Sequence, residues 1–338
     1  MPPEQQPSAR PTPNIAVWGA PGSGKTTFLA ALNIALILKK GPWKVVGADG
    51  PSRDFLIEMT SALSEQQRFP DATLALGQYK WFLTRQIEKR RWPLGRKSVQ
   101  SERIGLDVLD APGGFYSAKR ASAPTSREEL LNNLQGSRGI VYLFDPIREH
   151  KVGDAFSYLH GVLTELAGRM LTGNRYAGDV LPHHLAVCVT KFDELKVLQT
   201  AEKLGLLAPD PDDPFGFPRI DDDYAEELFE QLCGISRYGN AKMVVPALKQ
   251  HFRHDRIKFF VTSSIGFYLD NEKGAFDPDD PQNLVPTARP AAGEAGTATS
   301  PGSGFQIRGP VHPINVMEPM VWLGRRISAE RPAGETRG

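Results

Sequence analysis

One glycine-rich segment, Gly19 to Thr26, constrains the fold of this chain more than any other feature of its sequence. It has the sequence GAPGSGKT and matches the spacing G-x-x-x-x-G-K-[ST]. A short apolar run, residues 15–18, precedes it, and an Ala- and Leu-rich stretch, residues 26–39, follows it. A strand that turns through such a loop into a helix lets the loop expose backbone N–H groups to a phosphate. The sequence therefore predicts a phosphate-binding loop at this point.

The chemistry of the loop side chains suggests a role for each. We expect the Lys25 ammonium to neutralise the β- and γ-phosphates as a catalytic group, and the Thr26 hydroxyl to bind Mg²⁺. The positive end of the following helix adds to the field that a phosphate meets. The predicted phosphate-binding residues of the loop are Gly19, Ala20, Pro21, Gly22, Ser23, Gly24, Lys25, Thr26 and Thr27.

Strand-like and helix-like segments alternate along the rest of the chain. The predicted strands are residues 15–18, 43–46, 78–88, 103–109, 140–144, 185–189 and 257–261. The predicted helices are residues 26–39, 53–67, 128–134, 154–171, 224–232 and 315–327, the last with Asn315 and Glu318 as a capping pair. Residues 78–88 and 103–109 are expected to pair as an antiparallel hairpin. The alternation predicts an α/β fold, a three-layer α/β/α arrangement around a mostly parallel sheet with one antiparallel strand.

A second motif, DAPG at residues 110–113, ends one of the predicted strands. An aspartate at the carboxyl end of a strand can hold Mg²⁺, and the Gly113 amide can sense a γ-phosphate. Asp107 is a rival for the metal, but it lies inside the predicted strand. We therefore expect Asp110 to be the metal-binding residue and Gly113 to contact phosphate.

A third motif, TKFD at residues 190–193, follows the apolar run 185–189. A carboxylate at Asp193 can accept hydrogen bonds from N1–H and the amino group of guanine, a pair of donors that adenine lacks. The stem of Lys191 can cover the face of the base. After the next apolar run, residues 262–264 have the sequence TSS, where a backbone N–H can meet the guanine O6. The predicted guanine-binding residues are Thr190, Lys191, Asp193, Ser263 and Ser264.

Taken in order, these motifs resemble the TRAFAC class of P-loop GTPases over residues 14–327. The phrases VWGAPGSGKTTFLAAL, LDAPGG, GIVYLFDPIRE and PINVMEPMVWL are also similar to bacterial double-GTPase-type proteins of conflict and signalling systems. The resemblance implies a switch that binds GTP with Mg²⁺ and hydrolyses it to GDP and phosphate. A protein partner or partner GTPase would then read residues 68–77 and 113–127.

The class resemblance also implies a switch threonine, for which Thr73 is the best candidate as a catalytic and metal-binding residue. Two positions depart from the class. Gly114 stands where many members carry a glutamine that orients water, so intrinsic hydrolysis is expected to be slow or to depend on a partner. Thr190 replaces the asparagine of N-K-x-D, whose amide usually braces the phosphate loop, and this weakens the expectation of strong guanine selectivity.

Because the motifs span nearly the whole chain, one GTPase domain over residues 14–327 is expected rather than two. Residues 1–13 are expected to be a disordered lead-in and residues 328–338 a flexible tail. Within the domain, residues 194–255 are expected to be a helical and loop insertion. Residues 277–313, rich in Pro, Gly, Ala, Thr and Ser, are expected to be flexible.

Composition limits the kinds of partner. With 40 Lys+Arg against 39 Asp+Glu, the net charge of +1 argues against bulk attraction to nucleic acid or anionic membrane. The two cysteines, Cys188 and Cys233, suggest a reducing compartment, and a cytoplasmic location without membrane insertion is expected. A basic stretch in the hairpin is expected to be a solvated tip, with contact to a partner or nucleic acid as the alternative. It contains Lys89, Arg90, Arg91, Arg96, Lys97 and Arg103.

Two other functions use the same phosphate loop. The chain can be an ATPase or nucleotide kinase, or a scaffold that binds nucleotide without turnover. The base that binds at Asp193 distinguishes an ATPase or nucleotide kinase from a GTPase. Phosphate release distinguishes a scaffold from a GTPase.

Overall fold

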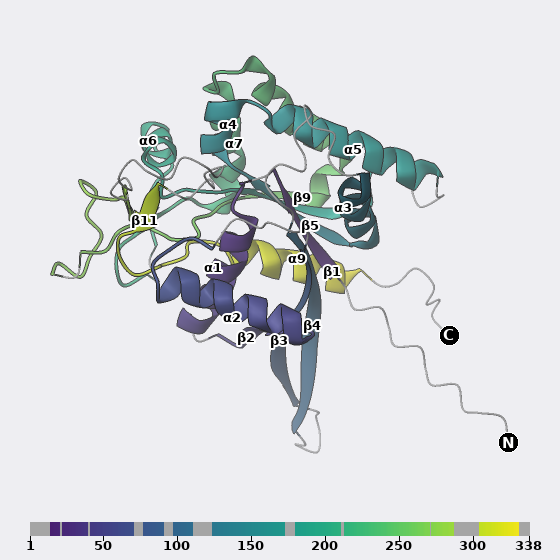
Figure 1. Ribbon diagram of the computed structural model, residues 1–338, viewed down its shortest axis with the longest axis horizontal. Helices are drawn as coiled ribbons and strands as arrows, with labels where there is room; N and C mark the ends of the chain where they lie inside the picture. The colour runs from purple at the N-terminus through teal and green to yellow at the C-terminus, as the bar shows by residue number, and fades with distance from the viewer. Residues whose placement is uncertain are drawn as a thin grey trace, which may run out of the picture.

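A seven-stranded sheet lies at the centre of the structure, with helices on both faces (Figure 1). This computed structural model describes residues 14–20, 22–39, 41–70, 77–90, 97–110, 124–172, 180–210, 213–270, 272–286 and 304–330. The strands lie in the order β2 (Trp43–Gly47), β3 (Gly77–Arg90), β4 (Lys97–Asp110), β1 (Asn14–Gly19), β5 (Gly139–Phe144), β6 (His184–Val189) and β9 (Ile257–Val261).

Strand direction in this sheet matches the expectation. β3 pairs antiparallel with both β2 and β4, whereas β4, β1, β5, β6 and β9 pair in parallel with their neighbours. The three central parallel strands, β1, β5 and β6, are short apolar runs that are buried on both faces, as strands between two helical layers must be. The predicted fold class, a mostly parallel α/β sheet with one antiparallel strand, is confirmed.

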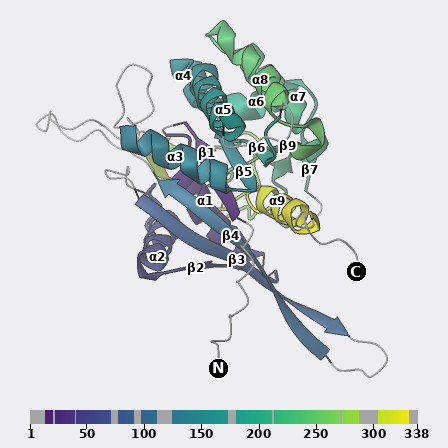
Figure 2. The same cartoon turned by 90° about the vertical axis from the view of Figure 1, so that its right-hand side faces the viewer.

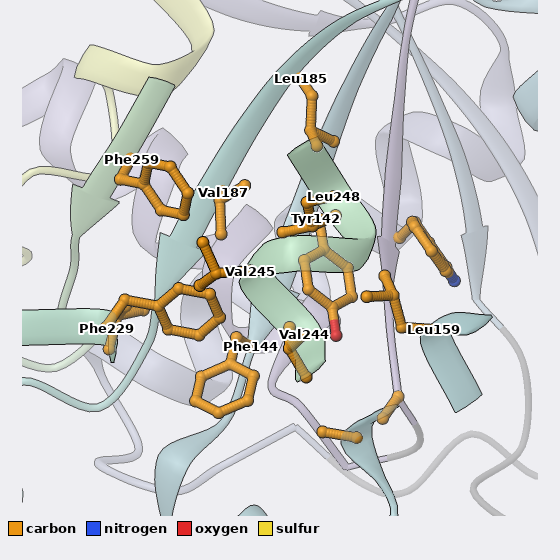
Figure 3. Close-up of a cluster of buried hydrophobic side chains, with 14 of the residues drawn as sticks. Tyr142, Phe144, Leu159, Leu185, Val187, Phe229, Val244, Val245, Leu248 and Phe259 are labelled. Atoms are coloured by element: carbon orange, nitrogen blue, oxygen red, sulfur yellow. The ribbon is translucent and has the colours of Figure 1, made fainter. Parts of the chain in front are cut away.

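Alternate residues of each central strand point to opposite helical layers. On β5, Tyr142 and Phe144 join one buried cluster, and Val141 and Leu143 join the other. The first cluster, part of which Figure 3 shows, lies under α3 (Pro124–Gly136), α5 (Ala155–Thr172), α7 (Ala225–Gly234) and α8 (Val244–His251). The second lies under α1 (Lys25–Leu38), α2 (Gly50–Ser64) and α9 (Glu318–Ala329).

The β3–β4 hairpin is longer than predicted. β4 begins at Lys97 rather than near residue 103, and the register pairs Arg90 with Lys97. Because β2 ends its pairing with β3 at Arg85, the rungs from residues 86–90 to residues 97–101 form a two-stranded ribbon (Figure 2). We call this segment the ribbon. Residues 86–88 lie in the predicted strand 78–88, but residues 89–90 and 97–101 lack the apolar alternation of a half-buried strand, so the pattern did not predict them as strand.

The segment 277–313, expected to be flexible, is ordered at both of its ends. β10 (Leu284–Pro286) pairs antiparallel with β11 (Phe305–Ile307). The buried Asn283 side chain accepts a hydrogen bond from the Gly309 N–H and donates to the Pro310 carbonyl. These bonds order a sequence whose composition alone does not provide a core; residues 287–303 lie outside the described ranges.

The C-terminal helix begins later and ends later than predicted. Its N-cap is Met317, and Asn315 takes φ 53° and donates its side-chain amide to Asp222 and to the Val261 carbonyl. Asn315 is therefore not the cap, because its side chain already binds a neighbouring strand end. The expected flexible tail was also placed too early, because α9 reaches Ala329 and Glu330 forms ion pairs.

Two helices were not predicted as separate elements, α4 (Pro146–Val152) and α6 (Leu195–Lys203). The insertion 194–255 contains α6, α7 and α8, together with the short pair β7 (Ala208–Pro209) and β8 (Pro218–Arg219).

The division into one domain stays a prediction, and residues 1–13 and 331–338 lie outside the described ranges. Within the described chain, none of the helices has the length and apolar content needed to cross a bilayer.

Candidate functional site

The predicted site residues that the structure describes gather at one edge of the sheet. The register aligns Gly19 of β1 with Leu143 of β5, and Phe144 of β5 with Val189 of β6. Val189 in turn aligns with Val261 of β9. The loops that leave the carboxyl ends of these strands therefore begin side by side. In an open α/β sheet this edge is where ligands bind.

The phosphate-binding loop turns from β1 into α1 as the sequence predicts. Gly22 and Gly24 take φ values of 71° and 86°, which favour glycine. Gly19 has no space for a side chain, because a Cβ would lie 2.5 Å from Ser23 Oγ and 2.8 Å from the Leu143 carbonyl oxygen. Lys25 is the first residue of α1, so the N-terminal amides of this 14-residue helix face the loop. Pro21 lies outside the described residues.

Lys25 bends back over its own loop. Its buried ammonium lies 3.2 Å from the Gly19 carbonyl oxygen and 3.4 Å from that of Ala20. This arrangement concentrates positive charge over the loop, beside the positive end of α1. Thr26 and Thr27 follow in the first turn and are partly exposed.

The predicted metal-binding residues are only partly visible. β4 pairs with β1 so that Val108 faces Val17, and continuing this register brings the backbone of Asp110 beside Gly19. The side chain of Asp110, and the whole of Thr73 and Gly113, lie outside what the structure describes. A threonine hydroxyl and an aspartate carboxylate supply the oxygen donors that Mg²⁺ prefers, so the residue types fit the ion.

Asp107, the rival aspartate, has a different partner. Its carboxylate accepts a hydrogen bond of 2.9 Å from the side-chain amide of Asn14. Asn14 is the first residue of β1, at the opposite end of that strand from the phosphate loop. This contact removes the reason to place Asp107 at the metal.

The TKFD segment follows β6 and is tied to the end of β5. The Thr190 hydroxyl and backbone N–H both donate to the Phe144 carbonyl, at 3.0 and 2.9 Å. Lys191 takes φ 61° and forms an ion pair of 2.8 Å with the carboxylate of Asp145. Asp145 is buried and also accepts the N–H groups of Ile147 and Arg148, which makes it the N-cap of α4.

Asp193 is buried and held by the loop that follows β9. The Ser263 hydroxyl donates to Asp193 Oδ1 and accepts the Gly266 N–H. Burial raises the pKa of Asp193 to about 6, although the hydrogen bond from Ser263 opposes the shift. Ser264 follows Ser263, so the predicted base-binding residues of the two loops are brought together. An anionic acceptor whose position is fixed in this way suits a ligand that offers N–H donors.

Two residues near the site were missed by the sequence analysis. Asp145 carries a recognisable signal, since Asp followed by Pro after an apolar run is a helix N-cap with proline at N1. Tyr158 of α5 donates its hydroxyl to the Gly19 carbonyl oxygen at 3.2 Å. Its place in the sequence, within an amphipathic helix, gives no sign of this contact.

No protein-family model and no curated protein sequence matches the chain. Among solved structures, it is similar to the signal recognition particle receptor SRb–GTP/SRX complex from Chaetomium thermophilum. That match has 13% identity and a TM-score of 0.35, over 78% of this chain and 96% of the other.

The S. cerevisiae Ski7 GTPase-like domain bound to GTP matches at 13% identity and a TM-score of 0.36, over 95% of this chain and 51% of the other. Bacterial selenocysteine-specific elongation factor EF-Sec matches at 12% identity and a TM-score of 0.29, over 75% of this chain and 26% of the other. Superpositions this loose carry no functional argument, so the site residues have to be judged by their own geometry.

Proposed function

We propose that this chain is a Mg²⁺-dependent GTP-binding switch that hydrolyses GTP slowly. One observation carries the proposal: a glycine-rich loop with its lysine, and a buried aspartate held by a serine, leave the same edge of one sheet. The loop suits phosphates, and the aspartate suits a base with two N–H donors. The switch would act in a bacterial signalling or conflict system, a proposal that only the resemblance of the sequence to bacterial double-GTPase-type proteins supports.

Each part of the nucleotide would meet a defined group. Lys25 and the loop amides would hold the phosphates, and the carboxylate of Asp193 would accept the guanine N–H groups. Lys191, held by Asp145, would cover the base with its stem. Thr26, Thr73 and Asp110 would hold Mg²⁺, which when bound neutralises charge on the phosphate oxygens.

Slow turnover and a partner belong to the same proposal. Gly114 has no side chain to orient the attacking water, so an activating group would have to come from elsewhere. A protein partner would read the nucleotide state through residues 68–77 and 113–127. The chain would work as a single domain in the cytoplasm, and nucleic acid would not be its partner.

Nucleotide competition tests the base assignment. Binding of GTP, ATP and XTP is measured for the wild type and for Asp193→Asn. A guanine-binding site predicts a preference for GTP in the wild type, and a loss of GTP with a gain of XTP in the variant. ATP binding that is preferred and unchanged by the substitution would reject the guanine assignment in favour of the ATPase or kinase alternative.

Phosphate release tests the switch. GTP turnover with Mg²⁺ is measured for the purified chain alone and with fractions of the host cytoplasm, beside a Lys25→Ala control. Slow basal release that a fraction accelerates, and that Lys25→Ala abolishes, supports a switch. Release absent under every condition would leave a nucleotide-binding scaffold.

A further inference from the structure

The phosphate-binding loop is hydrogen-bonded to α5, a helix on the face of the sheet opposite to α1. Tyr158 of α5 donates its hydroxyl to the Gly19 carbonyl oxygen at 3.2 Å, and this contact is buried. α5 packs on the same face of the sheet as Trp18, which is the residue before Gly19 in β1. The helix therefore reaches the loop at the point where the strand ends.

The direction of this hydrogen bond is fixed by a second donor. The Trp18 indole N–H lies 3.0 Å from Tyr158 Oη, in a buried contact. An indole nitrogen can only donate, so the phenol oxygen accepts this bond and keeps one proton to give. That proton goes to Gly19, and the chain of bonds runs from Trp18 through Tyr158 to the loop.

The receiving oxygen belongs to Gly19, the residue at which β1 ends and the loop begins. The Gly19 carbonyl also accepts the Lys25 ammonium at 3.2 Å, so the tyrosine and the lysine share one acceptor. Gly19 has no space for a side chain, because a Cβ there would lie 2.5 Å from Ser23 Oγ and 2.8 Å from the Leu143 carbonyl oxygen. A fixed carbonyl at this position sets both the direction in which the loop leaves β1 and the place of the lysine head.

The Thr190 hydroxyl of the TKFD segment does not bind the phosphate-binding loop. Thr190 Oγ1 donates its single proton to the Phe144 carbonyl at the end of β5. We propose that Tyr158 is a positioning residue, which braces the phosphate-binding loop through the Gly19 carbonyl and so increases affinity for the phosphates. The inference rests on the proposed nucleotide site, but it gives a role to a residue of α5, which lies outside all of the sequence motifs.

Tyr158→Phe removes one oxygen and keeps the ring, and Tyr142→Phe is its matched control. Tyr142 is also a buried tyrosine, with its ring 4.8 Å from that of Trp18. In the nucleotide-free protein, we expect Tyr158→Phe to speed amide exchange of residues 22–28 by about five- to tenfold, the worth of one hydrogen bond. Tyr142→Phe should leave this exchange unchanged. The measurement needs no ligand, so it stands even if the base assignment fails.

Ligand binding separates a loop brace from general damage. Affinity for GDP should fall by about five- to tenfold in Tyr158→Phe, whereas affinity for guanosine, which has no phosphate, should stay the same. Trp18→Phe, which removes the indole donor, should give a smaller loss for GDP alone. If GDP and guanosine weaken equally, or if exchange and GDP affinity both match the wild type, the positioning role is rejected. If the chain binds ADP rather than GDP, the same comparison is made with ADP and adenosine.

Discussion

Asp193 is the residue whose charge the guanine proposal needs. Burial raises the pKa of Asp193 to about 6, and the Ser263 hydrogen bond lowers it by less than burial raises it. Only the ionised carboxylate can accept both guanine hydrogen bonds, so protonation competes with binding. Affinity for GDP should therefore fall about tenfold between pH 7 and pH 5. Titration with a ribose-labelled fluorescent GDP at the two pH values measures this.

Asp193→Asn supplies the control, because it binds no proton in this range. Its remaining affinity for GDP, whose guanine ring does not ionise in this range, should not follow a carboxyl titration near pH 6. Low pH weakens GDP binding but has the opposite effect on folding. Because the pKa of Asp193 is higher in the folded state, protonation of this carboxyl stabilises the nucleotide-free protein, most fully below the unfolded value of 3.8. This stabilisation is lost as the pH rises through about 6. An unchanged GDP affinity from pH 7 to pH 5 would show that Asp193 does not bind the base.

Asp145 has two roles that one substitution can separate. It is the N-cap of α4 and the ion-pair partner of Lys191. Asparagine is an equally good N-cap, so Asp145→Asn should keep α4 and lose the ion pair. Since the Lys191 side chain is 36% exposed, we expect only a three- to tenfold loss of GDP affinity, about 1 kcal/mol, measured by the same titration.

A control for this effect is Asp154→Asn, which removes the partner of Arg148 in the next part of the chain. It should leave GDP affinity unchanged. Equal losses in Asp145→Asn and Asp154→Asn would show that the charge around α4, rather than the position of Lys191, affects binding.

At the level of elements, the carboxylate of Glu330, the C-cap of α9, contacts three side chains at the amino end of the sheet. Glu330 lies 2.6 Å from Arg256, 3.0 Å from Arg138 and 3.0 Å from the His184 ring. Burial acts to raise the pKa of Glu330, but the His184 hydrogen bond and the Arg256 charge outweigh it and lower the pKa below 4.5. Glu330→Gln should lower the free energy of unfolding by about 1 kcal/mol at pH 7 in a denaturant titration.

The pH dependence of this loss has a definite sign. A lowered folded-state pKa gives stability that is present above the unfolded value and is lost as the pH falls through the folded one. The difference between wild type and Glu330→Gln should therefore shrink below pH 4.5. Asp255→Asn removes an ion pair whose partners are 58% and 63% exposed, and it should change nothing. A difference in the free energy of unfolding between wild type and Glu330→Gln that persists at low pH would show that the Glu330 ion pairs do not cause it.

The elements differ in how well sequence pattern predicts them. The central strands and α1 are continuous apolar segments that the core requires, and they lie within a residue or two of their predicted positions. The ribbon and the β10–β11 pair depend on backbone pairing and on one buried side chain, Asn283. Neither residues 89–101 nor the β10–β11 pair shows apolar periodicity, so the sequence predicted a polar connection for the first and a flexible segment for the second.

The candidate site shows the same division at the scale of the whole molecule. Loop residues such as Lys25 and Asp193 belong to motifs with fixed spacing, and the sheet brings them to one edge. Tyr158 and Asp145 act through contacts between distant segments, and Tyr158 is 139 residues from Gly19. No local pattern encodes such a contact, because it depends on the placement of α5 over β1. Thr73, Gly113 and the side chain of Asp110 stay predictions.

Hydrogen exchange should reveal an uneven distribution of stability across the whole chain. β5 and β6 are buried on both faces, so their amides should exchange only through global unfolding. In the described part of the chain, residues 86–90 and 97–101 pair with each other and with no third strand. An isolated two-stranded pair is marginally stable, so the ribbon should open locally and exchange at least about 100-fold faster than β5.

Mass spectrometry of exchange at two protein concentrations and at several low denaturant concentrations tests this pattern. Exchange of β5 should depend steeply on denaturant, because global unfolding exposes much surface, whereas exchange of the ribbon should hardly depend on it. Addition of GDP should slow exchange of β5 through the linkage of binding to folding, and leave the ribbon as fast as before. A ribbon as protected as β5 at both concentrations would mean that contacts within the molecule hold it. Protection that appears only at the higher concentration would mean that a second copy covers it, so either result contradicts an independently opening ribbon.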